Sequence, residues 1–123
     1  MLGALDRGAL LALVPPKGET LKNLSKPEKI YCDNTNLMRA LTPRADRGTG
    51  RETFFFNQIR KDHQAVFSGV GDFLVDGKWT FEVGGAGKGF NQVKDISTAY
   101  VVNDDTEIGL GQKIPIWLFG FLY

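Results

Sequence analysis

Two acidic residues, Asp72 and Glu82, have the types and the spacing to do chemistry together. They lie in the segment GDFLVDGKWTFEVG, from Gly71 to Gly84, whose alternating apolar residues are typical of a β-hairpin. If residues 76–78 form the loop between its strands, Asp72 and Glu82 face each other, with β-carbons roughly 5 Å apart. Two facing carboxylates either share a cation or repel each other.

A second register of the hairpin is open. Asp76 and Gly77 alone could form a two-residue type I′ turn, and the two acids would then point to opposite faces. We expect the three-residue loop, because a slip by one residue would break an otherwise continuous apolar face. That face would consist of Phe73, Val75, Trp79, Phe81 and Val83.

The facing acids suggest a metal site. Hard divalent cations such as Mg²⁺ and Mn²⁺ prefer carboxylate oxygens, so Asp72 and Glu82 are the predicted metal ligands. The alternative is that both acids are edge residues in water, with Lys78 or Lys88 as a nearby counter-ion.

The length and composition describe one domain, residues 1–123, with no space for a second. A net charge of +1 gives no bulk electrostatic argument for nucleic acid, so any such contact must be local. The single cysteine, Cys32, excludes an intrachain disulfide. No signal pattern or membrane-length apolar run is visible, and we therefore expect a cytoplasmic protein without membrane contact.

The sequence pattern predicts an α/β fold, a small mixed β-sheet flanked by helices. The expected elements are a helix over residues 2–14 stopped by proline, a polar basic loop at 17–28, a strand at 29–33, a helix at 34–41, a helix at about 50–62, a strand at 64–67, the hairpin, a helical turn near 90–95 and a strand at 98–102. The C-terminal tail, IPIWLFGFLY, should dock on the core or on a partner.

Glu52 is a third candidate acid, and it has a rival explanation. It precedes Phe55, Phe56 and Ile59 on one face of the helix expected at 50–62. However, Thr49 and Glu52 are spaced as a capping box, in which each residue satisfies the backbone amide of the other. A site role and a capping role both stay open for Glu52.

The order of these elements and acids resembles the PD-(D/E)xK nuclease superfamily. The resemblance implies a restriction-endonuclease-like fold, with Glu52, Asp72 and Glu82 around a divalent metal and Gln92 on the following helix. The family's lysine belongs two residues after Glu82, where this chain has Gly84. Lys88, in the loop GGAGKG, is the candidate substitute and completes the catalytic set that the resemblance suggests.

A closer resemblance extends over nearly the whole chain. The segments KPEKIYCDNTNLMRAL, GRETFFFNQI, GDFLVDGKWTFEVG and IPIWLFGFLY are similar to the C-terminal nuclease-like domain of prokaryotic AAA-type ATPases. This implies an upstream ATPase module, so the chain is expected to be a fragment or C-terminal part of a longer protein. No segment of the chain fits the phosphate-binding motif GxxxxGK[ST], since Glu82 stands where its first glycine belongs.

Three functions follow as hypotheses. The first is a catalytically degenerate accessory domain of an AAA-type ATPase, serving recognition or assembly. The second is a metal-dependent DNA endonuclease that uses Mg²⁺ or Mn²⁺, and the third is a structural domain that binds a protein partner or itself through the apolar tail. The basic residues that could contact nucleic acid, if folding gathers them, are Lys22, Lys26, Lys29, Arg44, Arg47, Arg51, Arg60 and Lys61.

Overall fold

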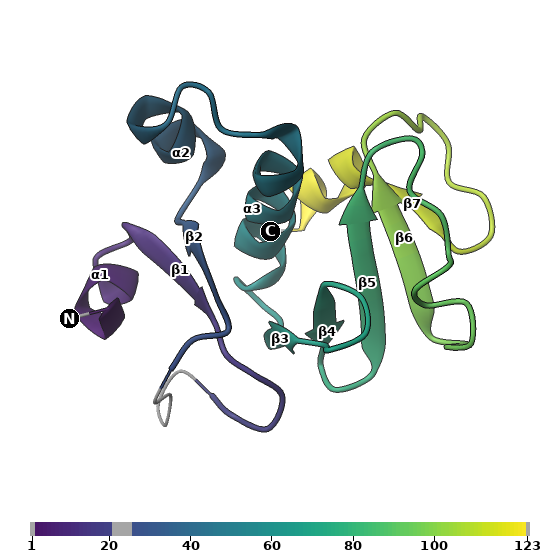
Figure 1. Ribbon diagram of the computed structural model, residues 1–123, viewed down its shortest axis with the longest axis horizontal. Coiled ribbons are helices and arrows are strands. Elements are labelled where there is room, and N and C mark those ends of the chain that lie inside the picture. Colours follow the sequence, from purple (N-terminus) through teal and green to yellow (C-terminus); the bar gives the residue numbers. More distant parts are fainter. Residues whose placement is uncertain (1, 21–25, 123) are drawn as a thin grey trace.

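The fold is mixed α/β, with a five-stranded sheet, a two-stranded sheet and helices between and beside them (Figure 1). This computed structural model describes residues 2–20 and 26–122. Lys22 and part of the expected loop at 17–28 lie outside the described residues. The elements are α1 (Leu2–Arg7), β1 (Leu11–Val14), β2 (Lys29–Cys32), α2 (Thr35–Leu41), α3 (Arg47–Ile59), β3 (Ala65–Phe67), β4 (Phe73–Val75), β5 (Trp79–Gly84), β6 (Ala99–Asn103), β7 (Lys113–Pro115) and the 3-10 helix η1 (Ile116–Phe121).

The large sheet has the order β3-β4-β5-β6-β7. Its first three strands pair antiparallel, and β6 and β7 then continue parallel to β5. The small sheet pairs β1 with β2 antiparallel. The two sheets are joined where the amide of Phe67 donates to the carbonyl of Pro15 at 2.8 Å. The β1–β2 pair is thereby held beside the edge strand β3 of the large sheet.

The hairpin has the register that its apolar face predicts. Val75 pairs with Trp79 and Phe73 pairs with Phe81 across a loop of three residues. Asp76 and Gly77 both adopt positive φ, 52° and 67°, and Asp76 is one of two described non-glycine residues that do so. The three-residue loop is therefore confirmed, and a one-residue slip is avoided because Phe73 and Val75 would lose their place in the core.

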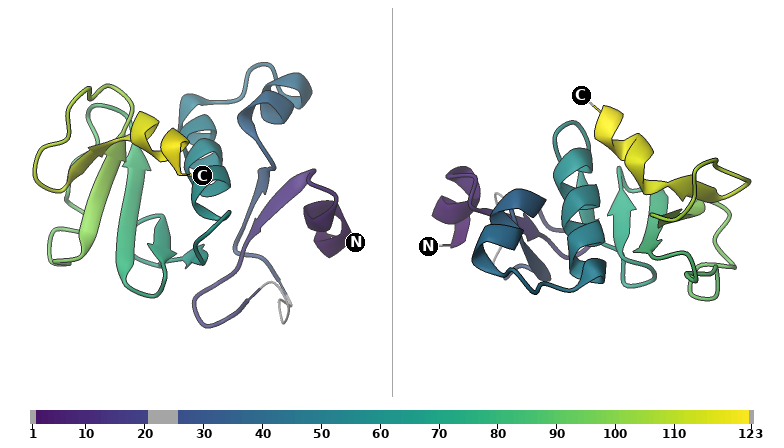
Figure 2. Two further views of the ribbon diagram at one scale, coloured as in Figure 1. Left: turned by 180° about the vertical axis from the view of Figure 1, so that it is seen from behind. Right: turned by 90° about the horizontal axis from the view of Figure 1, so that it is seen from above.

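Helix α3 stands between the two sheets and supplies the centre of the core (Figures 1 and 2). Phe55 is fully buried, with its ring centroid 5.3 Å from that of Phe73 and 5.1 Å from that of Phe81. Phe56 stacks on Phe73 at 5.6 Å from the side of the small sheet, where Tyr31 of β2 joins the contact. One aromatic cluster therefore fixes α3 against both sheets.

The opposite face of the large sheet is also covered. Side chains alternate along a strand, so Glu82 shares this face with its register partner Val101 on β6. The segment at residues 85–98 crosses the face, and its Val93 packs on Ala99 and Val101. This segment forms turns rather than a helix, with bonds such as Val93 to Phe90. A carboxylate on β5 is consequently enclosed between the sheet and this crossing.

Two sequence-based boundaries are wrong. The helix expected at residues 2–14 ends at Arg7, because Ala9 turns with a φ of 56° and residues 11–14 instead form β1. Three of the four β1 residues are buried, and their backbone groups pair with β2. Helix α3 begins at Arg47, three residues earlier than expected.

The C-terminal tail docks on the core, and its partly buried Ile114, Ile116 and Leu122 pack against the core cluster. Phe119 of η1 is buried, with its ring 4.8 Å from Phe55 and 5.8 Å from Phe81. Trp117, Leu118 and Phe121 of the same helix remain exposed. Among the described residues, no helix has the length and apolar character needed to cross a membrane.

We expect replacement of Phe119 and of Phe121 by alanine to have very different effects on stability. Phe119→Ala opens a cavity between Phe55 and Phe81 and should cost about 3 to 5 kcal/mol of the free energy of unfolding. Phe121→Ala removes a side chain that is 63% exposed and should change it by less than about 0.5 kcal/mol. Urea denaturation measures both, and equal losses would contradict the placement of the tail.

Candidate functional site

The three acids singled out in the sequence, Glu52, Asp72 and Glu82, lie near one another and form what we call the acid cluster. The ammonium of Lys29, from β2, lies 3.2 Å from Oε2 of Glu52 and 3.4 Å from Oδ1 of Asp72. Because both carboxylates contact the same nitrogen, their oxygens can be no further apart than the sum of these distances. Helix α3 and the hairpin thus present two acids to one cation.

Asp72 is held in place by the turn before β4. Gly71 has a φ of +81°, and a β-carbon there would lie 3.1 Å from the Thr80 side chain and 3.2 Å from that of Val93, so glycine is needed for this close approach. The amide of Asp72 donates to Phe81 at 2.9 Å. Its Oδ2 accepts the amide of Val83 at 2.8 Å, which leaves Oδ1 for Lys29.

Glu82 is the most buried charged side chain of the cluster, with 1% of its surface exposed. The ammonium of Lys88 forms an ion pair with its Oε1. The amide of Gln92 is oriented with its nitrogen toward Glu82, where it donates to the two carboxylate oxygens at 3.0 and 3.2 Å. Burial raises the pKa of Glu82 above its ordinary value, although the bond from Lys88 opposes the shift.

Lys88 reaches Glu82 by passing over Gly84. A β-carbon added at residue 84 would lie 2.7 Å from Cγ of Lys88 and 2.8 Å from its Cβ and Cδ, too close for any side chain there. The stem of Lys88 therefore fills the space that a side chain at residue 84 would need. The lysine that the resemblance expects two residues after Glu82 is absent, but an ammonium still reaches the carboxylate.

Glu52 does not cap α3. The N-cap is Asp46, whose side chain accepts the amide of Thr49 at 2.9 Å. Of the two roles open for Glu52, the capping box with Thr49 is wrong, because the helix starts earlier and Glu52 lies in its second turn rather than its first. Oε2 of Glu52 instead accepts hydrogen bonds from the hydroxyl of Tyr31 and the ammonium of Lys29.

Lys29 and Tyr31 belong to the site although sequence reasoning assigned them no role in it. They are two residues apart on β2 and so lie on one face of that strand. Burial, and then the hydrogen bond to Glu52, raise the pKa of the Tyr31 hydroxyl, which therefore stays protonated and donates. The i, i+2 spacing is visible in the sequence, but the pairing of β2 with α3 across more than 20 residues is not.

The chemistry of these donors fits a hard divalent cation, although the carboxylates now face ammonium groups. Within residues 2–20 and 26–122, no group of three or more histidine, cysteine or acidic side chains is spaced to hold a metal ion. Three carboxylates with Lys29 and Lys88 leave one negative charge. With a divalent ion in place of Lys29, the cluster would be neutral, so an exchange of one cation for the other is electrostatically favourable. The metal site at Asp72 and Glu82 stays a prediction.

Comparison with known proteins adds no relative. A scan against protein-family models, a search of curated proteins and a search of solved structures each gave no match to this chain. The resemblance to nuclease-like domains of AAA-type ATPases accordingly rests on the motifs of the sequence and remains a prediction.

If Lys29 competes with a metal ion, its removal should tighten metal binding. We expect Lys29→Met to lower the dissociation constant for Mn²⁺ by about tenfold, the equivalent of 1.4 kcal/mol, because the shared ammonium no longer has to be displaced. Isothermal titration calorimetry measures the change. Lys61→Met, an exposed lysine outside the acid cluster, is the control, and unchanged or weaker binding in Lys29→Met would contradict the competition.

The raised pKa of Glu82 has a consequence for stability. The contribution of the Glu82 carboxyl to the free energy of unfolding is fully present below the pKa that this group has in the unfolded chain. It is lost as the pH rises through the higher pKa of the folded state, because the folded state favours the protonated acid. Glu82→Gln cannot titrate, so its stability relative to that of the wild type should rise between about pH 5 and about pH 8. Denaturant unfolding at both pH values tests this.

The exposed Glu107→Gln serves as the matched control for this titration, and it should track the wild type at both pH values. A stability difference between Glu82→Gln and the wild type that does not vary with pH would contradict the assignment.

Proposed function

We propose that the acid cluster is the site of a metal-dependent phosphodiesterase that acts on nucleic acid, in a restriction-endonuclease-like fold. The observation that carries the proposal is the position of Lys88, whose stem fills the space beside Gly84 and whose ammonium pairs with Glu82. The missing side chain at Gly84 argues for a degenerate site, and a substitute lysine at the carboxylate counters that argument.

The order of the elements supports the same proposal. One acid comes from helix α3, the second from the turn before β4 and the third from β5, in that order along the chain. The hairpin brings Asp72 and Glu82 to the same region, and Lys29 links Asp72 to Glu52. The arrangement of the three acids is consistent with the restriction-endonuclease-like fold that the motifs suggest.

The residues would divide the work as follows. Asp72 and Glu82 would hold Mg²⁺ or Mn²⁺, which would supply an acidified water and neutralise charge on the phosphate, and Glu52 would add a third carboxylate beside them. The hydrogen bond to Glu82 raises the pKa of Lys88, so its ammonium stays protonated at neutral pH. Lys88 would thus act as a donor that orients water or a phosphate oxygen, and not as a general base.

Gln92 and Tyr31 would position the acids. Gln92 donates to both oxygens of Glu82, and the hydroxyl of Tyr31 donates to Glu52. Each contact fixes the rotation of a carboxylate, which a metal ligand needs in order to present its oxygens at a defined angle.

The wider context is a second, separate proposal. The motifs similar to prokaryotic AAA-type ATPases suggest that the domain serves a longer ATPase as an accessory module, and the reading frame upstream of Met1 tests this directly. The hypothesis of a protein-binding tail is favoured only by the exposed apolar residues of η1, Trp117, Leu118 and Phe121.

Moving the lysine tests the proposed activity. Lys88→Gly should reduce Mn²⁺-dependent cleavage of plasmid DNA by about a hundredfold, the loss expected for one charge-stabilising group. The double variant Gly84→Lys with Lys88→Gly should recover most of that loss, because the new lysine stands two residues after Glu82. Glycine is chosen at residue 88 because the β-carbon of Lys88 lies 2.8 Å from the position that the β-carbon of a residue-84 side chain would take.

Controls separate chemistry from contamination and from folding. Asp72→Asn should abolish cleavage, whereas Lys78→Gly on the hairpin loop should leave it unchanged, and all variants should give the same far-ultraviolet spectrum. If the wild type binds no Mn²⁺ and leaves supercoiled, branched and single-stranded DNA intact, the domain is degenerate and the proposal fails.

A further inference from the structure

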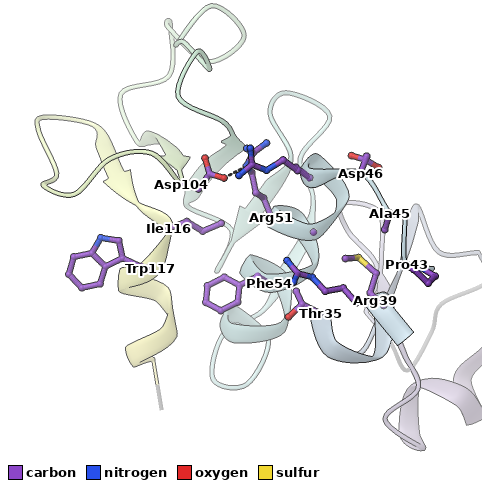
Figure 3. A pocket seen from close by; sticks show the side chains of 13 residues that line it. Thr35, Arg39, Pro43, Ala45, Asp46, Arg51, Phe54, Asp104, Ile116 and Trp117 are labelled. Carbon is purple, nitrogen blue, oxygen red and sulfur yellow. Dashed lines mark hydrogen bonds and ion pairs between the residues drawn. The ribbon is translucent and has the colours of Figure 1, made fainter. Parts of the chain in front are cut away.

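A cavity of about 680 Å³ opens between α2, the first turns of α3 and η1, next to the acid cluster but outside it (Figure 3). We call it the arginine pocket. Its size suits one drug-sized or nucleotide-sized group. Its lining includes Arg39, Arg47, Arg51, Phe54, Asp104 and Ile116.

The charged groups of the arginine pocket leave a positive excess. Arg51 donates to Oδ2 of Asp104 at 2.6 Å, and this bond lowers the pKa of Asp104, with a further contribution from the charge of Arg47. Asp46 is occupied as the cap of α3. Arg39 and Arg47 are exposed, and neither forms an ion pair with another described residue. The pocket therefore has two arginines available for an anion.

One acceptor of the pocket lacks a donor. Oδ1 of Asp104 is buried and has no hydrogen-bond partner among the described residues, although Oδ2 of the same carboxylate is satisfied. A buried acceptor without a partner costs free energy unless a ligand supplies the donor. A ligand of this pocket should hence carry an N–H or O–H group as well as a negative charge.

The floor of the pocket is apolar. Phe54 of α3 and Ile116 of η1 are partly buried and line the pocket (Figure 3). A flat aromatic group can pack on such a surface and stack with a guanidinium. Anion, donor and aromatic surface together are the chemistry of a nucleotide.

The pocket and the acid cluster share a wall. Arg51 directly precedes Glu52 in α3, and its guanidinium lies against Gly85, where a β-carbon would be 3.2 Å from Nη2. Gly85 is in turn the neighbour of Gly84, over which Lys88 reaches Glu82. The pocket and the acid cluster are therefore neighbours on α3.

We propose that the arginine pocket binds one nucleotide of a single-stranded segment, with its phosphate on Arg39 and Arg47, its base over Phe54 and Ile116, and a donor of the nucleotide on Oδ1 of Asp104. This inference rests on the proposed function, since it names single-stranded nucleic acid as the substrate class of the same site. In a duplex the base is paired and stacked and does not enter such a pocket.

Binding without metal tests the pocket apart from catalysis. Fluorescence anisotropy of a labelled single-stranded oligonucleotide, in EDTA, should show affinity that falls by about fivefold to tenfold in Arg39→Ala and in Arg47→Ala. Arg44→Ala is the matched control, because Arg44 is exposed in the loop between α2 and α3 but does not line the pocket. The loss of strand affinity in this variant should stay below about twofold.

Two further probes decide the role of the base. A duplex of the same sequence and an oligonucleotide with abasic sites should each bind more weakly than the single strand. Arg39→Ala should cost the duplex no further affinity, whereas the abasic strand, which keeps its phosphates, should still lose affinity in this variant. If Arg44→Ala and Arg39→Ala lose the same affinity for the single strand, the arginines act only through their general positive charge, and the inference is overturned. Equal binding of the abasic strand would overturn it as well.

The failures of the two proposals are distinguishable. Cleavage that persists while Arg39→Ala and Arg47→Ala leave strand binding unchanged overturns the pocket and retains the phosphodiesterase. Strand binding that depends on both arginines, with no cleavage in Mn²⁺, retains the pocket as a recognition site and overturns the phosphodiesterase.

Discussion

The burial of one carboxylate, that of Glu82, is the constraint on which the rest of the site depends. A carboxylate with 1% of its surface exposed is costly unless other groups satisfy it. Lys88 and Gln92 do so from the segment at 85–98, and this segment can cross the sheet closely because Gly84 has no side chain. The glycine, the lysine and the crossing are thus consequences of a single buried charge.

Helix α3 connects this constraint to the core. Its Phe55 and Phe56 lock the helix against both sheets, while Glu52 and Arg51, about one turn nearer its start, belong to the acid cluster and the arginine pocket. Side chains on a packed helix keep their positions more accurately than those on a loop. Lys29 extends the arrangement to the small sheet, so β2 also contributes to the site although it pairs with no strand of the large sheet.

The sequence was most informative where structure is decided locally. The hairpin register followed from the alternation around Phe73 and Phe81, because one slip would move the whole apolar face. Strand β1 was missed, since the leucine-rich start fits a helix as well as a buried strand, and the choice is made by pairing with β2, 15 residues beyond it. Lys29 and Tyr31 were missed for the same reason: their partner, Glu52, is distant in the sequence.

Lys88 shows why a motif defined by sequence spacing can miss a site defined by space. What the carboxylate of Glu82 requires is an ammonium within hydrogen-bond reach, and the chain position that supplies it is not fixed by that requirement. A lysine at residue 84 would reach Glu82 along the strand, whereas Lys88 reaches it by folding back over a glycine, and the two side chains exclude each other because their β-carbons would be 2.8 Å apart. Gly84 and Lys88 together therefore supply Glu82 with an ammonium group, as a lysine at residue 84 would do alone. The glycine removes this group from the site only if Lys88 is left out of account.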